Sequence, residues 1–320
     1  MAESSATATD ARSGTEANAA ALPAGWLSRR PWATFLLPMA VYMLVGSLEP
    51  TPPDTPPDTP PQTTAEQEFI GTPDEQLPLE QLQEQPSYPP EQTGLLPEIP
   101  YRYYPWVYTA KIVLTVVAML VVCPGYRTFS WRVSGLSIVV GVVGVVLWIV
   151  LCHLRLEEKI VGPVDRFLGG LWPWSNEETP SIGLMAVLGT GERSAFNPLE
   201  QLAATPLWAY LFLVIRFTGL ALIVPVIEEF FLRGFLMRYV IHVNWWQVPF
   251  GQVNRTAVIL GTAIAMLMHP GELLAALVWF SMVTWLMVRT RNIWDCVMAH
   301  AVTNLLLGIY VVTYDEWQLM

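Results

Sequence analysis

The chain has 320 residues, of which 53% are hydrophobic and only 14% are charged. Soluble domains carry about 25% charged residues, so this composition favours a protein with several membrane spans. Residues 49–100 hold eleven of the 27 acidic residues and no Lys or Arg, and they account for most of the formal net charge of −10. The remaining chain is nearly neutral and has no basic face, so no nucleic acid is expected as a partner.

The first hundred residues divide into three segments. Residues 1–28 are rich in Ala, Ser and Thr and are expected to be a disordered N-terminal tail. Residues 29–48 begin with two arginines, continue into an apolar run and are predicted to be an uncleaved first transmembrane anchor. Residues 49–100 contain fourteen of the 27 prolines. This acidic, Pro-rich linker lacks the apolar content of a packed core, so we predict a spacer.

Further apolar segments approach the ~20 residues that a helix needs to cross a bilayer. They are Pro105–Cys123, Val133–Cys152, Pro206–Ile227, Thr256–Met268, Leu273–Val288 and Ile293–Val312. The segment Glu229–Val243 is a candidate for one more crossing. We therefore predict an all-α polytopic transmembrane helical bundle with about seven to eight spans. Residues 101–203 would supply two spans and an interfacial loop with Trp172 and Trp174, and residues 204–320 would form the catalytic membrane domain.

Basic residues indicate the orientation, because they are enriched on the cytoplasmic side of membrane proteins. Arg29 and Arg30 are predicted to be cytoplasmic, which places the acidic linker outside and the cluster Arg127–Arg132 inside. Arg289 and Arg291 face outside if Glu229–Val243 crosses the membrane, and inside if it does not. Both alternatives remain open from the sequence.

Glu228, Glu229 and Arg233 are the most informative residues, because ionisable groups at membrane depth are energetically expensive and mark functional sites. Glu229 and Arg233 are four residues apart and share a helix face, so we expect an ion pair. Glu228 lies about 100° away around the helix and is expected to point into a cavity as a general base. The alternative is a helix end with snorkelling charges.

Two further polar positions follow on apolar helices. His269 ends one apolar run beside Pro270, and His300 and Asn304 lie one helical turn apart on the last one. An imidazole and a carboxamide stacked in this way can both donate to one oxygen, as the stabilisation of an oxyanion requires. The alternatives are a structural histidine at a helix end, and hydrogen bonds that only join helices.

These motifs resemble the CPBP family, which contains CAAX proteases and bacteriocin-processing proteins of the membrane. Its pattern is EExxxR, then a histidine commonly in FxxxH, then HxxxN or HxxxD. The corresponding segments are Glu228–Arg233, Ala265–His269 and His300–Asn304, with Ala265 in the usual Phe position. The flanks Val224–Glu229 and Arg289–Trp294 resemble a narrower branch, the CAAX prenyl protease-related proteins found with bacterial exosortase sorting systems.

The resemblance implies a catalytic cavity between helices and roles for individual residues. Glu228 would activate water, His269 would orient it or share the proton, and His300 with Asn304 would hold the oxyanion. Glu229 and Arg233 would be supporting residues. No cofactor is firmly expected. If the chemistry is zinc-dependent, Glu228, His269 and His300 would supply a His₂Glu set, but the chain lacks HExxH, which favours metal-free catalysis.

The leading hypothesis is an intramembrane endopeptidase of the bacterial inner membrane. It would cleave a membrane-anchored, CAAX-like or C-terminal sorting substrate and would have a functional link to a sorting system. One alternative is a non-catalytic membrane scaffold or immunity-type protein of the same fold. Another is a transporter that uses polar groups at the membrane midplane.

Overall fold

The computed structural model describes residues 25–50, 99–171 and 196–319, and the regular structure in these ranges is helical. The predicted tail and linker lie almost entirely outside the described residues, as do Trp172 and Trp174. Within the described ranges, five helical segments are long and apolar enough to cross a membrane, and two apolar helices are shorter. The predicted all-α polytopic membrane bundle is therefore confirmed.

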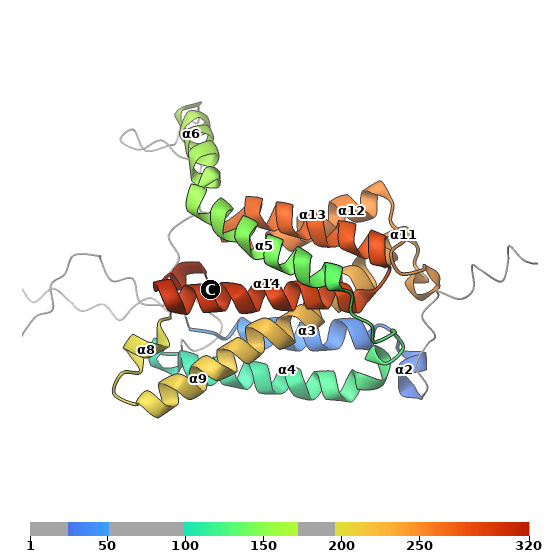
Figure 1. The fold of residues 1–320 in the computed structure, drawn as a ribbon, viewed down its shortest axis with the longest axis horizontal. Helices are drawn as coiled ribbons and strands as arrows, with labels where there is room; N and C mark the ends of the chain where they lie inside the picture. The colour runs from blue at the N-terminus through green and yellow to red at the C-terminus, as the bar shows by residue number, and fades with distance from the viewer. Residues whose placement is uncertain (1–24, 51–98, 172–195, 320) are drawn as a thin grey trace, which may run out of the picture.

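The helices of the bundle run roughly along one common axis (Figure 1). The crossing segments are α4 (Tyr104–Tyr126), α5 (Gly135–Leu154), the continuous segment Pro206–Ile241, α13 (Leu273–Thr290) and α14 (Ile293–Tyr314). The shorter helices are α3 (Ala33–Gly46) and α12 (Arg255–Leu267). Small elements outside these helices include α2 (Trp26–Arg29), α8 (Pro198–Gln201) and the 3-10 turns η2 (Tyr101–Tyr103), η5 (Trp245–Gln247), η6 (Pro270–Glu272) and η7 (Trp317–Leu319).

The segment Pro206–Ile241 is one helical unit of 36 residues. It consists of α9 (Pro206–Thr218), the π-helical turn η3 (Gly219–Ile223), α10 (Val224–Glu229), the π-helical turn η4 (Phe230–Leu236) and α11 (Met237–Ile241). The segment Glu229–Val243 is thus a continuation of the preceding helix and adds no crossing of its own. At 1.5 Å per residue the unit is about 54 Å long, more than the hydrocarbon core of a bilayer.

Because Pro206–Ile241 is one continuous helical unit, Arg289 and Arg291 lie at the same end of the bundle as Arg127 and Arg132. The loop before α5 contacts the start of α14: Asn292 donates to the carbonyl of Arg132, and Trp131 stacks on Trp294 with ring centroids 3.8 Å apart. The exposed arginines at this end, which we call the arginine end, are Arg29, Arg30, Arg127, Arg132, Arg255, Arg289 and Arg291. Arg289 and Arg291 therefore lie on the same side of the membrane as Arg127 and Arg132, as the alternative without a separate crossing by Glu229–Val243 predicts.

Two glycines of α5 let the neighbouring helices approach closely. A Cβ at Gly141 would lie 2.7 Å from Val302, and one at Gly144 would lie 2.8 Å from the indole nitrogen of Trp279. Small residues are common where membrane helices pack, because apolar burial does not favour helix contact over lipid contact. The close approach brings α5 against both α13 and α14, which carry residues of the candidate site.

The interfacial loop predicted within residues 101–203 contains a regular helix. After α5, Arg155 adopts a left-handed conformation (φ 45°), and α6 (Leu156–Leu171) then points away from the bundle (Figure 1). α6 contacts α13 near the end of the bundle opposite the arginine end.

Candidate active site

The candidate site is built around the first π-helical turn, η3, and the proline that follows it. In this turn the amide of Val224 donates to the carbonyl of Gly219, five residues back. The next amide in the same pattern would belong to Pro225, which has no N–H, so the carbonyl of Leu220 has no backbone donor of this kind. The carboxamide of Asn304 on α14 fills the position, with Nδ2 2.9 Å from the Leu220 oxygen. Helix irregularities of this type occur frequently at functional sites.

The two adjacent glutamates of α10 have different environments. Glu229 is fully buried, and its Oε2 lies 2.5 Å from Nη1 of Arg233, so the expected ion pair is present. Arg233 also donates to the carbonyl of Phe280 at 3.0 Å, which ties this helix to α13. Glu228 is 6% exposed and lines a cavity, and its Oε2 makes no hydrogen bond with the described residues. Glu229 therefore stabilises the bundle, while Glu228 keeps an acceptor oxygen available.

His300 lies between the two glutamates. Its Nδ1 is 3.1 Å from Oε1 of Glu229, and its Nε2 is 4.0 Å from Oε2 of Glu228. A carboxylate paired with arginine only accepts hydrogen bonds, so Nδ1 of His300 carries a proton and donates it to Glu229. The Nε2 atom consequently faces Glu228 across a gap too wide for a direct hydrogen bond.

His269 is held by the backbone of its own helix. Its Nδ1 lies 2.9 Å from the carbonyl oxygen of Ala265, so the ring donates at Nδ1 and its Nε2 is an acceptor in the neutral state. The contact uses the backbone of Ala265, which explains how a residue other than Phe can stand at this position of the motif. The ring of Trp148 packs against His269 with centroids 5.7 Å apart.

The turn His269–Glu272 joins α12 and α13, which at 13 and 18 residues are about 20 Å and 27 Å long. Both His269 and Glu272 line the same cavity as Glu228.

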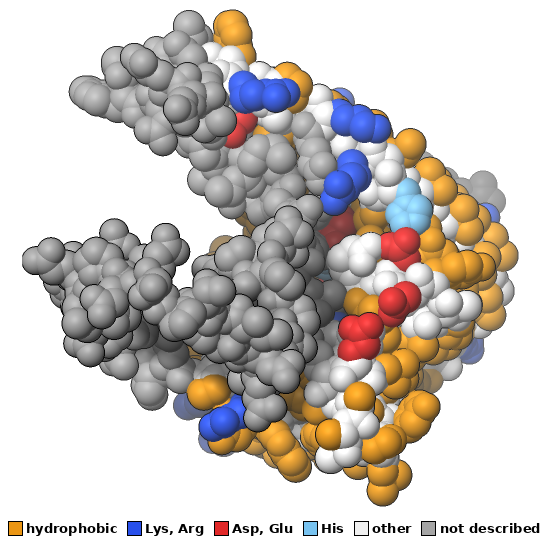
Figure 2. Space-filling model, turned by 90° about the vertical axis from the view of Figure 1, so that its left-hand side faces the viewer, with side chains coloured by type: hydrophobic (Ala, Val, Ile, Leu, Met, Phe, Trp, Pro, Cys, Tyr) orange, Lys and Arg blue, Asp and Glu red, His pale blue; other side chains and the backbone are white. Residues whose placement is uncertain are grey.

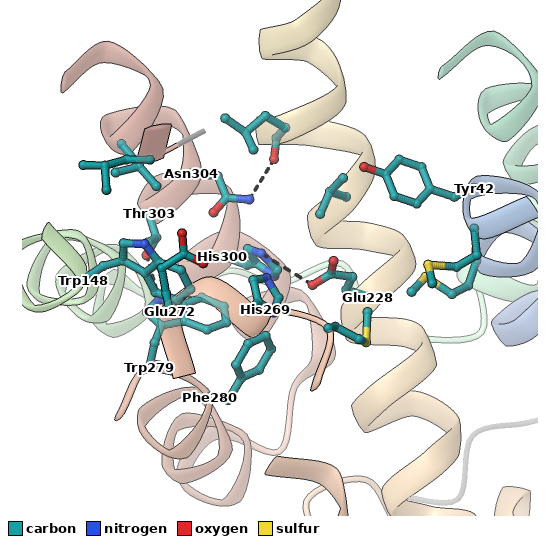
Figure 3. Close-up of a pocket in the computed structure, with 17 residues that line it drawn as sticks. Tyr42, Trp148, Glu228, His269, Glu272, Trp279, Phe280, His300, Thr303 and Asn304 are labelled. Atoms are coloured by element: carbon teal, nitrogen blue, oxygen red, sulfur yellow. Dashed lines mark hydrogen bonds and ion pairs between the residues drawn. The ribbon is translucent and has the colours of Figure 1, made fainter. Parts of the chain in front are cut away.

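One cavity of about 290 Å³ brings together the sequence-predicted residues Glu228, His269, His300 and Asn304 (Figure 3). Glu229 and Arg233 do not line it, but Glu229 contacts the lining residue His300, and Arg233 contacts the lining residue Phe280. Aromatic and apolar side chains from several helices complete the wall. They include Tyr42, Trp148, Trp279 and Phe280, together with Met39, Met268 and Leu307.

A zinc site does not fit this arrangement. Among the residues that the structure describes, no group of three or more His, Cys, Asp or Glu side chains is placed to hold a metal ion. Glu228, His269 and His300, the zinc ligands expected if the chemistry were zinc-dependent, are therefore not arranged as a ligand set in the described structure. Nδ1 of His269 bonds to Ala265 of its own helix, and Nδ1 of His300 bonds to Glu229 on a neighbouring helix.

Sequence reasoning missed four features of the site. It did not pair His300 with Glu229, because the two residues are 71 positions apart and only the fold brings them together. It overlooked Glu272, although an acidic residue between two apolar runs is itself a signal. Tyr42 on α3 and Trp148 on α5 lie in uniformly apolar helices, where nothing distinguishes them from residues that face lipid.

Comparison with known families supports the reading of these motifs. Residues 207–306 match the family model described as type II CAAX prenyl endopeptidase Rce1-like. No curated protein and no solved structure matches the chain. The matched segment includes Glu228, Glu229, Arg233, His269, His300 and Asn304, whereas α3 and α5, with Tyr42 and Trp148, lie outside it. The resemblance to CPBP-family CAAX proteases is thus confirmed for residues 207–306, which match an Rce1-like domain, whereas this match does not test the narrower exosortase-associated branch.

Proposed function

We propose that this membrane protein cleaves a peptide bond with a water molecule activated by Glu228. The observation that carries the proposal is Oε2 of Glu228, which makes no hydrogen bond with the described residues and lies 4.0 Å from Nε2 of His300 in a cavity lined largely by the Rce1-like domain. A gap of this size leaves room for a water oxygen that contacts both groups. We assign the base to Glu228 because this carboxylate lines the cavity and is not used by Arg233.

The proposed reaction follows from the hydrogen-bond directions. Glu228 takes a proton from the water, the water oxygen attacks the scissile carbonyl carbon, and the protonated Glu228 then gives its proton to the leaving nitrogen as the C–N bond breaks. His269 orients the water through its acceptor Nε2, since its Nδ1 donates to Ala265.

The developing oxyanion needs donors on the α14 side of the cavity. His300 supplies one when its Nε2 also carries a proton, because Glu229 accepts from its Nδ1 and Nε2 lies on the side of the cavity. Asn304 commits one N–H to the carbonyl of Leu220 and keeps a second for the oxyanion. Two such donors, fixed in place before the reaction, stabilise the charge that forms in the transition state.

The apolar and aromatic wall supports a membrane-anchored substrate, CAAX-like or with a C-terminal sorting signal. On the resemblance of the segments Val224–Glu229 and Arg289–Trp294 we further propose a location in the bacterial inner membrane and a functional link to an exosortase sorting system. Comparing the C-termini of membrane proteins in cells with and without this protein, by mass spectrometry, would identify the substrate. An unchanged set of C-termini would contradict this part of the proposal.

The test of catalysis is cleavage of a membrane-anchored peptide by the purified protein in liposomes. Glu228→Gln keeps the shape of the side chain but cannot take a proton, and we expect the rate to fall by ~10²–10⁴ with an unchanged melting midpoint. Glu200→Gln, at an exposed glutamate of α8, is the matched control and should retain full activity. Full activity of Glu228→Gln would overturn the assignment. Absence of cleavage by the wild type would favour a scaffold, and substrate uptake into the liposomes a transporter.

A further inference from the structure

We propose that α6 is an interfacial helix that binds the phospholipid surface of the membrane where α5 ends. The sequence of α6 has the necessary amphipathic pattern. Ile160, Val164, Phe167 and Leu168 are spaced by four, three and one residues, which places them on one face of a helix. This inference concerns a segment outside the Rce1-like domain and holds whether or not the protein is a peptidase.

The apolar face of α6 has no partner within the described chain. Ile160 is 58% exposed and Phe167 is 68% exposed, and Val164 and Leu168 are also exposed. The opposite side is polar: Lys159 and Arg166 are exposed, and Asp165 is buried. A helix with one strongly apolar and one charged face fits the boundary between acyl chains and water.

An exposed apolar stripe on α5 ends two residues before α6 begins. Exposed Val143, Val146, Val150 and Leu154 follow one another along α5 at helical spacing up to its last residue. Because α5 crosses the membrane, this stripe faces acyl chains, and its end marks the edge of the hydrocarbon. α6 begins two residues later, so its apolar residues start at the depth of the lipid headgroups.

The direction of α6 fits this position. The left-handed conformation of Arg155 ends α5 and redirects the chain. α6 then points away from the bundle, across the direction in which α14 runs (Figure 1), a direction that suits a helix lying along the membrane surface. Figure 2 looks at this end of the molecule, where Lys and Arg side chains lie beside hydrophobic ones in the upper part of the view. These basic groups can contact lipid phosphates while the apolar face enters the acyl region.

The occupant is lipid rather than a second protein because the apolar face of α6 begins at Ile160, six residues after the lipid-facing stripe of α5 ends at Leu154. A protein partner would have to cover the apolar face of α6 at the point where the chain leaves the acyl region of the membrane. The two possibilities differ in a measurable way: lipid contact places the face within reach of quenchers attached to acyl chains, whereas a protein partner excludes them.

The experiment compares neighbouring positions on opposite faces of α6 in the full-length protein. Cys123, Cys152 and Cys296 are replaced by Ala, and a single cysteine is introduced by Ile160→Cys, Phe167→Cys, Lys159→Cys or Arg166→Cys. Each variant is labelled with an environment-sensitive fluorophore and reconstituted in phosphatidylcholine–phosphatidylglycerol vesicles. The pairs 159/160 and 166/167 are adjacent in the chain, so they share a depth along the helix and differ only in the face that they report.

We expect the labels at 160 and 167 to show blue-shifted emission, quenching by brominated acyl chains and protection from aqueous iodide. The labels at 159 and 166 should show the reverse. Equal responses at all four positions would overturn the proposal. So would labels at 160 and 167 that are shielded from both iodide and brominated lipid, which would indicate a protein partner.

A second measurement uses the wild-type cysteines and covers a failure of the cysteine-free variant to fold. A phospholipid with a photoreactive diazirine in its acyl chain is added to the reconstituted wild-type protein, and crosslinked peptides are mapped by mass spectrometry. Crosslinks on residues 156–171 are expected beside those on α5, which serve as the internal control. Crosslinks on α5 without any on residues 156–171 would contradict the proposal.

Discussion

His300 donates from Nδ1 to Oε1 of Glu229 over 3.1 Å, so the imidazole is held by the second of the two adjacent glutamates and not by the first. The other oxygen of the same carboxylate meets Arg233. A chain of contacts thus runs from the buried arginine through Glu229 to the ring that faces Glu228. This explains why a catalytic motif would contain two glutamates. Glu228 is free for chemistry, and Glu229 fixes the position and tautomer of His300.

Arg233→Ala is predicted to destabilise the protein before it affects the chemistry. The change leaves buried Glu229 without its cationic partner, with only the contact to His300 remaining, and breaking a buried ion pair in this way costs on the order of 3–5 kcal/mol. The thermal midpoint in detergent should therefore fall clearly below that of the wild type. Arg289→Ala, at an exposed residue of the arginine end, is the control and should melt normally. Lost peptidase activity with a normal midpoint would instead assign Arg233 a direct part in catalysis.

The contact between Asn304 and Leu220 predicts coupling between Asn304 and Pro225. Asn304→Ala removes the donor to a partly buried carbonyl, and an unsatisfied carbonyl of this kind costs about 1–3 kcal/mol. Pro225→Ala restores a backbone N–H that can reach the Leu220 oxygen, so in that background Asn304→Ala should destabilise less. A double-mutant cycle on the thermal midpoints measures the difference. Additive effects of the two substitutions would mean that Pro225 is not the reason why Leu220 needs Asn304.

The same contact predicts the behaviour of Asn304→Asp. A carboxylate cannot donate to the carbonyl of Leu220, and it would place a negative charge against that oxygen. The family pattern accepts Asp at this position, so we expect some activity to remain, with a lower thermal midpoint than that of the wild type. Titrating the purified variant checks the reason: protonating the new carboxyl should raise the midpoint on acidification, a response that the wild type should lack.

Much of this architecture could be predicted from the sequence, because apolar runs of about 20 residues between charged turns have few alternatives in a membrane. The ion pair of Glu229 with Arg233 also followed from spacing alone. The sequence could not show that Pro206–Ile241 is one helical unit, because the charges at Glu228, Glu229 and Arg233 look like the end of a span. They are buried by α13 and α14 instead, and only the fold reveals that.

The helix α6 shows a different limit of sequence reasoning. Its mean hydropathy is low, and its glycines and Pro163 are typical of a loop, so no search for long apolar runs could find it. The sequence signal for α6 is the helical spacing of Ile160, Val164 and Phe167. This spacing is lost when hydropathy is averaged over a window. Tyr42 and Trp148 could not be predicted as lining residues for a related reason: which side of a uniformly apolar helix faces a cavity depends on its neighbours.

Chelation is predicted to leave the rate of peptide cleavage unchanged. The reaction proposed here needs Glu228, His269 and His300 only as acid–base and hydrogen-bonding groups, and these side chains are not arranged as a metal site in the described structure. Prolonged dialysis against a zinc chelator, followed by the peptide assay, tests this. The control is a zinc peptidase treated in the same way, which should lose activity. Stoichiometric metal in active protein that disappears in His269→Ala and His300→Ala variants would contradict the prediction.

The last prediction is the orientation of the protein in the membrane. Arg29, Arg127, Arg255 and Arg289 all lie at the arginine end, and an excess of basic residues marks the cytoplasmic side. The segment 51–98 leaves from the opposite end, where Glu49 pairs with Lys111 at 2.5 Å, and should face outward together with α6.

Single cysteines introduced by Ser130→Cys and Ser47→Cys sample the two ends in exposed positions. In intact cells a membrane-impermeant maleimide should label the variant at 47 but not the one at 130, and permeabilisation should expose both. The reverse labelling would show that the arginines face outward and would remove the basis for placing α6 on the outer surface.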